Sequence, residues 1–186
     1  TIENNSARLG QAVALHTEGD RLVFVNCRFL GHQDTVYTGV GGSRQLFRNC
    51  YIEGTTDFIF GPGTAWFEDC EIRSKANSYI TAASTPKDQP YGYVFNRCRL
   101  TADEGIDKVY LGRPWRDYGY TLFMNCDLGS HIRPEGWHHW QKTARYLECG
   151  NTGTGADTTG RVGWSRQLDK KEAKKITMEE VLGHIK

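Results

Sequence analysis

Two aspartates occupy equivalent positions in neighbouring repeats of the chain, where they could act together in acid–base or nucleophilic chemistry. Asp34 lies seven residues after Cys27 (34 − 27). Asp57 lies seven residues after Cys50 (57 − 50). Two carboxyl groups held close together resist simultaneous ionisation, so the pKa of one rises while that of the other stays low. One aspartate can then serve as an acid and the other as an ionised base or nucleophile.

Two glutamines are candidates for stabilising an anionic intermediate beside this pair. Gln11 lies sixteen residues before Cys27 (27 − 11). Asp34 lies sixteen residues before Cys50 (50 − 34), which predicts that Gln11 stacks one repeat below Asp34. The side-chain amides of Gln11 and Gln33 could donate hydrogen bonds to a developing oxyanion.

Arg113 is the candidate partner for one of the carboxylates. It precedes Cys126 by thirteen residues (126 − 113), the separation between Asp57 and Cys70 (70 − 57). An arginine beside a carboxylate keeps it ionised and fixes its orientation. Most aspartates in turns merely hydrogen-bond nearby backbone, but Asp57 lies in the apolar segment 55–61, which favours the catalytic interpretation.

The elements that must position these residues are indicated by a repeat around the six cysteines. Each copy reads aromatic, any residue, polar, Cys, polar, apolar, with the last copy weaker: 24–29, 47–52, 67–72, 95–100, 123–128 and 146–149. Successive cysteines are 23, 20, 28, 28 and 23 residues apart. Such a period marks a solenoid, and each unit is too short for a helical crossover. We therefore predict an all-β parallel β-helix, with equivalent residues about 4.8 Å apart on neighbouring coils.

The cysteines are predicted to be structural. We expect each cysteine and the aromatic residue three before it to face inward, with the apolar residue two after it on the opposite face. A stacked column of free thiols is then favoured over a disulfide framework. The absence of any C-x-x-C pair argues against a metal site.

The chain is predicted to form one domain over residues 1–186, with residues 168–186 as a C-terminal tail. Thr177 followed by Glu180 resembles a capping box that opens a short helix. The lysine-rich run 170–175 is interpreted as a solvated face.

The first residues of the sequence resemble the inside of a coil rather than its cap. Residues 1–4 already resemble a coil strand, so we expect that N-terminal coils are missing, were cleaved or are supplied by another chain. An open coil edge could drive self-association.

The composition excludes several classes of partner. Lys and Arg number 23 against 22 Asp and Glu, a formal net charge of +1. No global basic field is present to bind nucleic acid or an anionic membrane. No apolar run approaches the roughly 20 residues that span a bilayer.

At its candidate site residues the chain resembles the pectin methylesterase family. Four segments carry the resemblance, in the order typical of the family: 11–15 (Gln-Ala-Val-Ala-Leu), 33–35 (Gln-Asp-Thr), 57–61 (Asp-Phe-Ile-Phe-Gly) and 111–115 (Leu-Gly-Arg-Pro-Trp). The resemblance implies a right-handed parallel β-helix that needs no metal or organic cofactor. It implies methyl-esterified homogalacturonan (pectin) as the substrate, methanol and pectate as products, and hence a secreted or periplasmic location. A Gly-x-Tyr-x-Glu type segment of the family, which would precede Thr1, is absent.

The resemblance also implies a role for each site residue. Asp57 corresponds to the nucleophile, and Asp34 to the general acid that later acts as a base. Gln11 and Gln33 match the oxyanion stabilisers, and Arg113 matches the residue that holds the nucleophile. The residues alone indicate the pair of aspartates but not which of them attacks.

Aromatic residues beside these segments could bind sugar rings. Tyr37, Phe60 and Trp115 are candidates for an aromatic floor, although most aromatic residues pack in cores. Together with Gln11 and Arg113 they complete the expected substrate-binding set. His138 and His139 are interpreted as loop residues rather than metal ligands.

Two other functions fit parts of the pattern. A retaining glycosidase, such as a polygalacturonase-like enzyme, also places two carboxylates about 5 Å apart. A non-catalytic polysaccharide-binding solenoid fits the expected loss of N-terminal coils.

Overall fold

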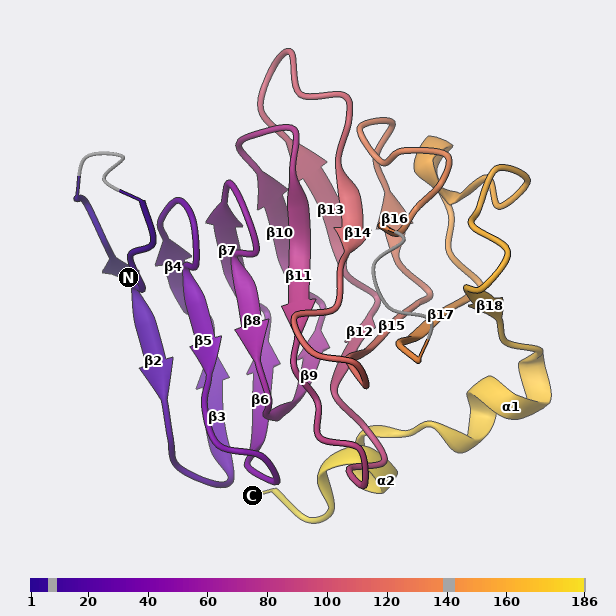
Figure 1. Cartoon of the computed structure of the whole chain (residues 1–186). Coiled ribbons are helices and arrows are strands. Elements are labelled where there is room, and N and C mark those ends of the chain that lie inside the picture. The colour runs from indigo at the N-terminus through magenta and orange to yellow at the C-terminus, as the bar shows by residue number, and fades with distance from the viewer. Residues whose placement is uncertain (7–9, 139–142, 186) are drawn as a thin grey trace.

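The chain winds into stacked coils of short parallel strands (Figure 1). The structure is a computed structural model that describes residues 1–6, 10–138 and 143–185. Its strands form three parallel sheets, here called A, B and C, and neighbouring strands within a sheet come from successive coils. The predicted all-β parallel β-helix is confirmed.

The three sheets run along the length of the β-helix. In spatial order, sheet A contains β1 (Ile2–Glu3), β4 (Arg28–Leu30), β7 (Tyr51–Gly54), β10 (Glu71–Ser74), β13 (Arg99–Ala102) and β16 (Asp127–Leu128). Sheet B contains β14 (Tyr110–Gly112), β11 (Tyr79–Ala83), β8 (Ile59–Gly61), β5 (Val36–Thr38) and β2 (Leu15–Thr17). Sheet C contains β18 (Arg166–Gln167), β17 (Arg145–Cys149), β15 (Tyr120–Met124), β12 (Tyr93–Asn96), β9 (Thr64–Glu68), β6 (Arg44–Arg48) and β3 (Leu22–Val25).

The residue before each of the first five cysteines turns the chain from sheet C into sheet A. These residues have left-handed backbone conformations, with φ between 52° and 56°: Asn26, Asn49, Asp69, Arg97 and Asn125. Asn and Asp adopt this conformation more readily than most residues. The turn interrupts the alternation of faces along the chain, so side chains on both sides of it can point inward.

The prediction that the apolar residue two after each cysteine faces away from the core is therefore wrong. Phe67, Cys70 and Ile72 all belong to one buried cluster. Strict alternation along one straight strand does not apply here, because each repeat is two strands joined at the left-handed residue. The inward placement of the aromatic residue and the cysteine is confirmed for the first five repeats.

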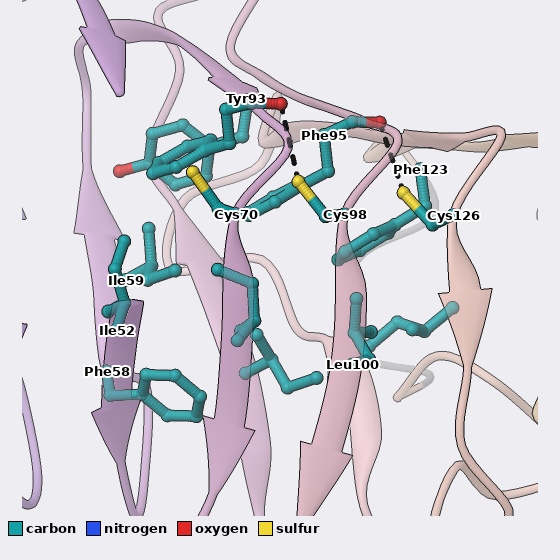
Figure 2. Packing of buried hydrophobic residues seen from close by; sticks show 14 of the residues in the cluster. Ile52, Phe58, Ile59, Cys70, Tyr93, Phe95, Cys98, Leu100, Phe123 and Cys126 are labelled. Carbon is teal, nitrogen blue, oxygen red and sulfur yellow. Dashed lines mark hydrogen bonds between the residues drawn. The ribbon is translucent and has the colours of Figure 1, made fainter. Parts of the chain in front are cut away.

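The core is a set of stacked columns, shown in Figure 2. Five phenylalanines lie on consecutive strands of sheet C with ring centroids 4.3–4.8 Å apart: Phe24, Phe47, Phe67, Phe95 and Phe123. Beside them the thiols of Cys98 and Cys126 donate to the carbonyl oxygens of Phe67 and Phe95 at 3.4 and 3.5 Å. All six cysteines are free thiols, as predicted.

The sixth cysteine does not join the column. Cys149 lies within β17, where its partner on β15 is Met124 rather than Cys126. It packs with the second apolar cluster, between sheet C and the C-terminal segment. The weaker copy of the repeat at 146–149 thus corresponds to β17. Unlike the first five copies, it has no left-handed residue directly before its cysteine.

The C-terminal segment covers part of the outer face of sheet C. Helix α1 (Lys170–Lys175) buries none of its residues, in agreement with the predicted solvated face. Helix α2 (Met178–Leu182) has Thr177 as its N-cap, and the Thr177 side chain accepts from the N–H of Glu180, one of the two bonds of the predicted capping box. The helix buries Val181 and Leu182. Within the described ranges, no helix combines the length and apolar character that crossing a bilayer requires.

The phenylalanine column should dominate the stability of the coils. Phe95 is fully buried between Phe67 and Phe123, so Phe95→Ala should lower the free energy of unfolding by about 3–5 kcal/mol, measured by urea denaturation. Val25→Ala, which changes a residue that is 46% exposed, serves as the control and should cost less than about 0.5 kcal/mol. Equal losses in the two variants would contradict the column as the main source of stability.

Candidate active site

Asp34 and Asp57 lie side by side on adjacent coils at the start of sheet B strands. Each precedes its strand by two residues, and each has a left-handed backbone, with φ of 67° for Asp34 and 50° for Asp57. The N–H of Asp34 donates to the carbonyl oxygen of Thr56 at 3.0 Å. This bond continues the ladder in which Val36 pairs with Ile59, so the two aspartates are separated by about one strand spacing, ~4.8 Å. The predicted pairing of the aspartates is confirmed.

The environment of Asp34 favours its protonated form. Asp34 is only 8% exposed. Burial, followed by the negative charge of Asp57, raises the pKa of Asp34 from 3.8 to about 6, against the opposing charge of Arg113. A carboxyl group with this pKa can hold a proton at mildly acidic pH and release it to a stronger base.

Arg113 clamps the carboxylate of Asp57. Its Nε donates to Oδ1 at 3.0 Å and its Nη2 donates to Oδ2 at 2.6 Å, a bidentate ion pair. Burial opposes the charge of the guanidinium, but the hydrogen bonds and charge of Asp57 raise the pKa of Arg113 above its usual value. The two oxygens of Asp57 are therefore held in a fixed plane.

Arg113 reaches Asp57 from two strands away. Arg113 and Asp57 each precede a cysteine by thirteen residues, but this shared separation does not make them level. Gly112 pairs with Thr81 on β11, and Thr81 pairs with Ile59 on β8. Arg113 thus starts one residue beyond the level of Ile59, and its long side chain crosses β11 to reach the carboxylate. A Cβ on Gly112 would lie 2.1 Å from Oγ1 of Thr81, so only glycine allows this approach.

The glutamines lie beside the aspartates but not quite as counted. The N–H of Ala12 donates to the carbonyl oxygen of Gln33 at 3.2 Å, which places Ala12, rather than Gln11, level with Asp34. The stacking predicted for Gln11 is therefore wrong by one residue, because the loop between β2 and β3, which lies between Gln11 and Cys27, is shorter than the equivalent loop between β5 and β6. Gln11 is exposed, and Gln33 is half-buried at a cavity of ≈ 280 Å³ that Thr55 also lines.

The structure brings the three predicted aromatic residues together. Tyr37 and Phe60 are paired on β5 and β8, with ring centroids 4.9 Å apart. The ring of Trp115 lies 5.7 Å from Phe60 and 6.5 Å from Tyr37. Trp115 is 42% exposed, so the group presents an aromatic surface to solvent beside Arg113.

A second aromatic group near Arg113 was missed by the sequence reasoning. The guanidinium carbon of Arg113 lies 4.2 Å from the ring centroid of Tyr79. Tyr79 in turn stacks on Tyr110 and contacts His138. No sequence spacing relates these three residues, and His138 was interpreted only as a loop residue.

No metal site is found among the histidines that the structure describes. Over residues 1–6, 10–138 and 143–185, no group of three or more His, Cys, Asp or Glu side chains is arranged to hold a metal ion. His139, considered with His138 in the sequence, lies outside the described residues.

Comparison with known proteins agrees with this geometry. The profile of the Pectinesterase family matches residues 1–184. A probable pectinesterase A of Neosartorya fischeri is 41% identical over 188 residues, covering 98% of this chain. The chain spans 56% of that relative's length.

Solved structures show the same fold. A pectin methylesterase from Aspergillus niger has a TM-score of 0.88 and 35% identity, covering 98% of this chain and 60% of that one. A pectin methylesterase in complex with a hexasaccharide has a TM-score of 0.84 and 29% identity, covering 98% of this chain and 68% of that one. The profile match along nearly the whole sequence, together with these relatives, places this chain in the pectinesterase family.

Proposed function

We propose that the chain hydrolyses the methyl esters at C6 of galacturonate units in pectin, which releases methanol and leaves pectate. The observation that carries the proposal is the contrast between two adjacent carboxyl groups. Asp57 forms a bidentate ion pair with Arg113, whereas burial and the charge of Asp57 raise the pKa of Asp34 to about 6. A nucleophile and a proton donor thus lie one strand apart.

In the first step Asp57 acts as the nucleophile. One of its oxygens attacks the C6 carbonyl carbon, and the carbonyl oxygen becomes an oxyanion that the amides of Gln11 and Gln33 stabilise. When this intermediate collapses, the bond between C6 and the methoxy oxygen breaks. Methoxide takes the proton of Asp34 and leaves as methanol, and C6 remains bound to Asp57 as an anhydride.

In the second step Asp34 acts as the base. Its carboxylate removes a proton from water, and the resulting hydroxide attacks C6. The bond between C6 and the Asp57 oxygen breaks, which returns the carboxylate of Asp57 to Arg113. The product is a C6 carboxylic acid that loses its proton to solvent, and Asp34 is again protonated.

The aromatic surface beside the two aspartates supports a carbohydrate substrate. The rings of Tyr37, Phe60 and Trp115 lie within 6.5 Å of one another and can pack against the apolar faces of sugar rings. Gln11 and Arg113 complete the proposed contacts, because the positive charge of Arg113 can attract a neighbouring galacturonate. A relative that binds a hexasaccharide is consistent with this surface.

The glycosidase and binding-only functions predict different products. A glycosidase acting on the same polymer would create new reducing ends, whereas the esterase releases methanol without chain cleavage. A binding solenoid would release neither. The pectinesterase family match and the relatives named above favour the esterase, since a fixed carboxylate nucleophile would serve either enzyme.

The location of the protein follows from the same proposal. The polymeric substrate implies action outside the cytoplasm, in the cell exterior or periplasm.

Removal of the nucleophile tests the reaction directly. We expect the wild-type chain to release methanol from highly methylated pectin without new reducing ends, and Asp57→Ala to lower kcat by roughly 10⁴-fold or more with the β-rich circular dichroism spectrum unchanged. Full activity in a folded Asp57→Ala variant would rule out the covalent role of Asp57. New reducing ends would support the glycosidase instead.

The pKa of Asp34 predicts a pH dependence. Because acylation requires protonated Asp34, and its pKa is about 6, kcat/KM should fall as the pH rises above about 6. Asp34→Asn cannot donate a proton, so it should lower kcat/KM by about 10²–10⁴-fold and remove this limb of the profile. A limb that persists unchanged in Asp34→Asn would assign the titration to another group.

A further inference from the structure

Tyr79 contacts both members of the Asp57–Arg113 ion pair. It is the first residue of β11, the strand that separates β8 from β14 in sheet B. Its carbonyl oxygen accepts the N–H of Asp57 at 2.9 Å. Its ring lies beneath the guanidinium group of Arg113, with 4.2 Å between the guanidinium carbon and the ring centroid. One residue therefore contacts the backbone of the nucleophile and the side chain that orients it.

Two neighbours fix the ring of Tyr79 in place. Tyr110, its partner on β14, stacks on it with centroids 5.4 Å apart and planes inclined by 13°. The hydroxyl of Tyr79 lies 3.2 Å from Nδ1 of His138. A ring held at its face and at its hydroxyl offers a fixed surface to the cation, and such a surface restricts the many rotamers of an arginine side chain.

We propose that Tyr79 is a positioning residue that keeps Arg113 aimed at Asp57 throughout the catalytic cycle. The inference deepens the proposed function and rests on it. During acylation Asp57 loses its full negative charge, which weakens its hold on Arg113. The attraction between the ring of Tyr79 and the guanidinium does not depend on the charge of Asp57. Arg113 therefore stays in place to receive the carboxylate when the anhydride is hydrolysed.

Steady-state kinetics on pectin separate positioning from substrate binding. Tyr79→Leu removes the ring and should lower kcat by about tenfold with little change in KM. Tyr79→Phe keeps the ring and should restore most of the lost kcat. If Tyr79→Leu does not fold, Tyr79→Met offers a flexible side chain of suitable volume. A wild-type kcat in the Leu or Met variant, or a change in KM alone, would overturn the proposal.

The matched control is a tyrosine–arginine pair on another sheet. The guanidinium carbon of Arg28 lies 4.6 Å from the ring centroid of Tyr51, which belongs to sheet A. Tyr51→Leu removes a comparable contact far along the coil from sheet B, so we expect kcat to remain at the wild-type value. Equal losses in Tyr51→Leu and Tyr79→Leu would indicate a general structural effect and overturn the positioning role.

A measurement that does not need turnover distinguishes failure of this inference from failure of the proposed function. Heteronuclear NMR reports the hydrogen exchange of the Arg113 Nε–H in the resting protein. We expect faster exchange in Tyr79→Leu than in the wild type and in Tyr79→Phe, even if the chain releases no methanol. Unchanged exchange in Tyr79→Leu would refute the positioning role. Absence of methanol from the wild type would refute the proposed function alone.

Discussion

The parallel backbone ladder between successive coils determines where every important side chain lies. Its hydrogen bonds hold equivalent residues of neighbouring coils about 4.8 Å apart. In the core this spacing lets phenylalanine rings stack with centroids 4.3–4.8 Å apart. On sheet B the same spacing holds Asp34 beside Asp57. In a flexible chain the repulsion between their negative charges would move the two carboxyl groups apart. The rigidity that stabilises the core therefore also holds the pair together.

This arrangement lowers stability in exchange for reactivity. Folding buries Asp34 beside a like charge and raises its pKa from 3.8 to about 6. A carboxyl group whose folded-state pKa is raised in this way costs no stability below its unfolded pKa of 3.8, because both states are then protonated. The cost grows as the pH rises from 3.8 to about 6 and is complete above about 6. The site thus destabilises the protein near neutral pH, and the stacked core must compensate. Such costs are typical of active sites whose residues must have shifted pKa values.

The positive charge of Arg113 offsets part of the electrostatic cost of burying Asp34 beside Asp57. The position of Arg113 depends on several neighbours. It crosses a strand to reach Asp57, and the approach of its own strand requires glycine at position 112. The ring of Tyr79 supports the guanidinium from below. Trp115, two residues after Arg113 in the chain, packs with Phe60 and Tyr37 in the other aromatic group. Arg113 thus contacts both Asp57 and the ring of Tyr79.

The sequence by itself determined the repeat, the aspartate pair and the family. The cysteine motif recurs once per coil, and Asp34 and Asp57 each lie seven residues after their cysteine. Residues at the same offset in successive coils lie next to each other in a parallel β-helix, so the sequence predicted that the two aspartates are neighbours. This reasoning holds only while loop lengths match. The loops after β2 and β14 differ in length from those of other coils, so counting misplaced Gln11 by one residue and could not give the level of Arg113.

Only the tertiary structure decided which distant side chains meet. The left-handed residues before the cysteines divide each repeat into two strands, and this bend, invisible to a simple alternation rule, turns the apolar residue after the cysteine into the core. The ring of Tyr79 meets Arg113 from a different strand, and His138 meets Tyr79 from a later loop. These contacts depend on side-chain reach across the sheet and on loop paths, neither of which follows from residue spacing along the chain.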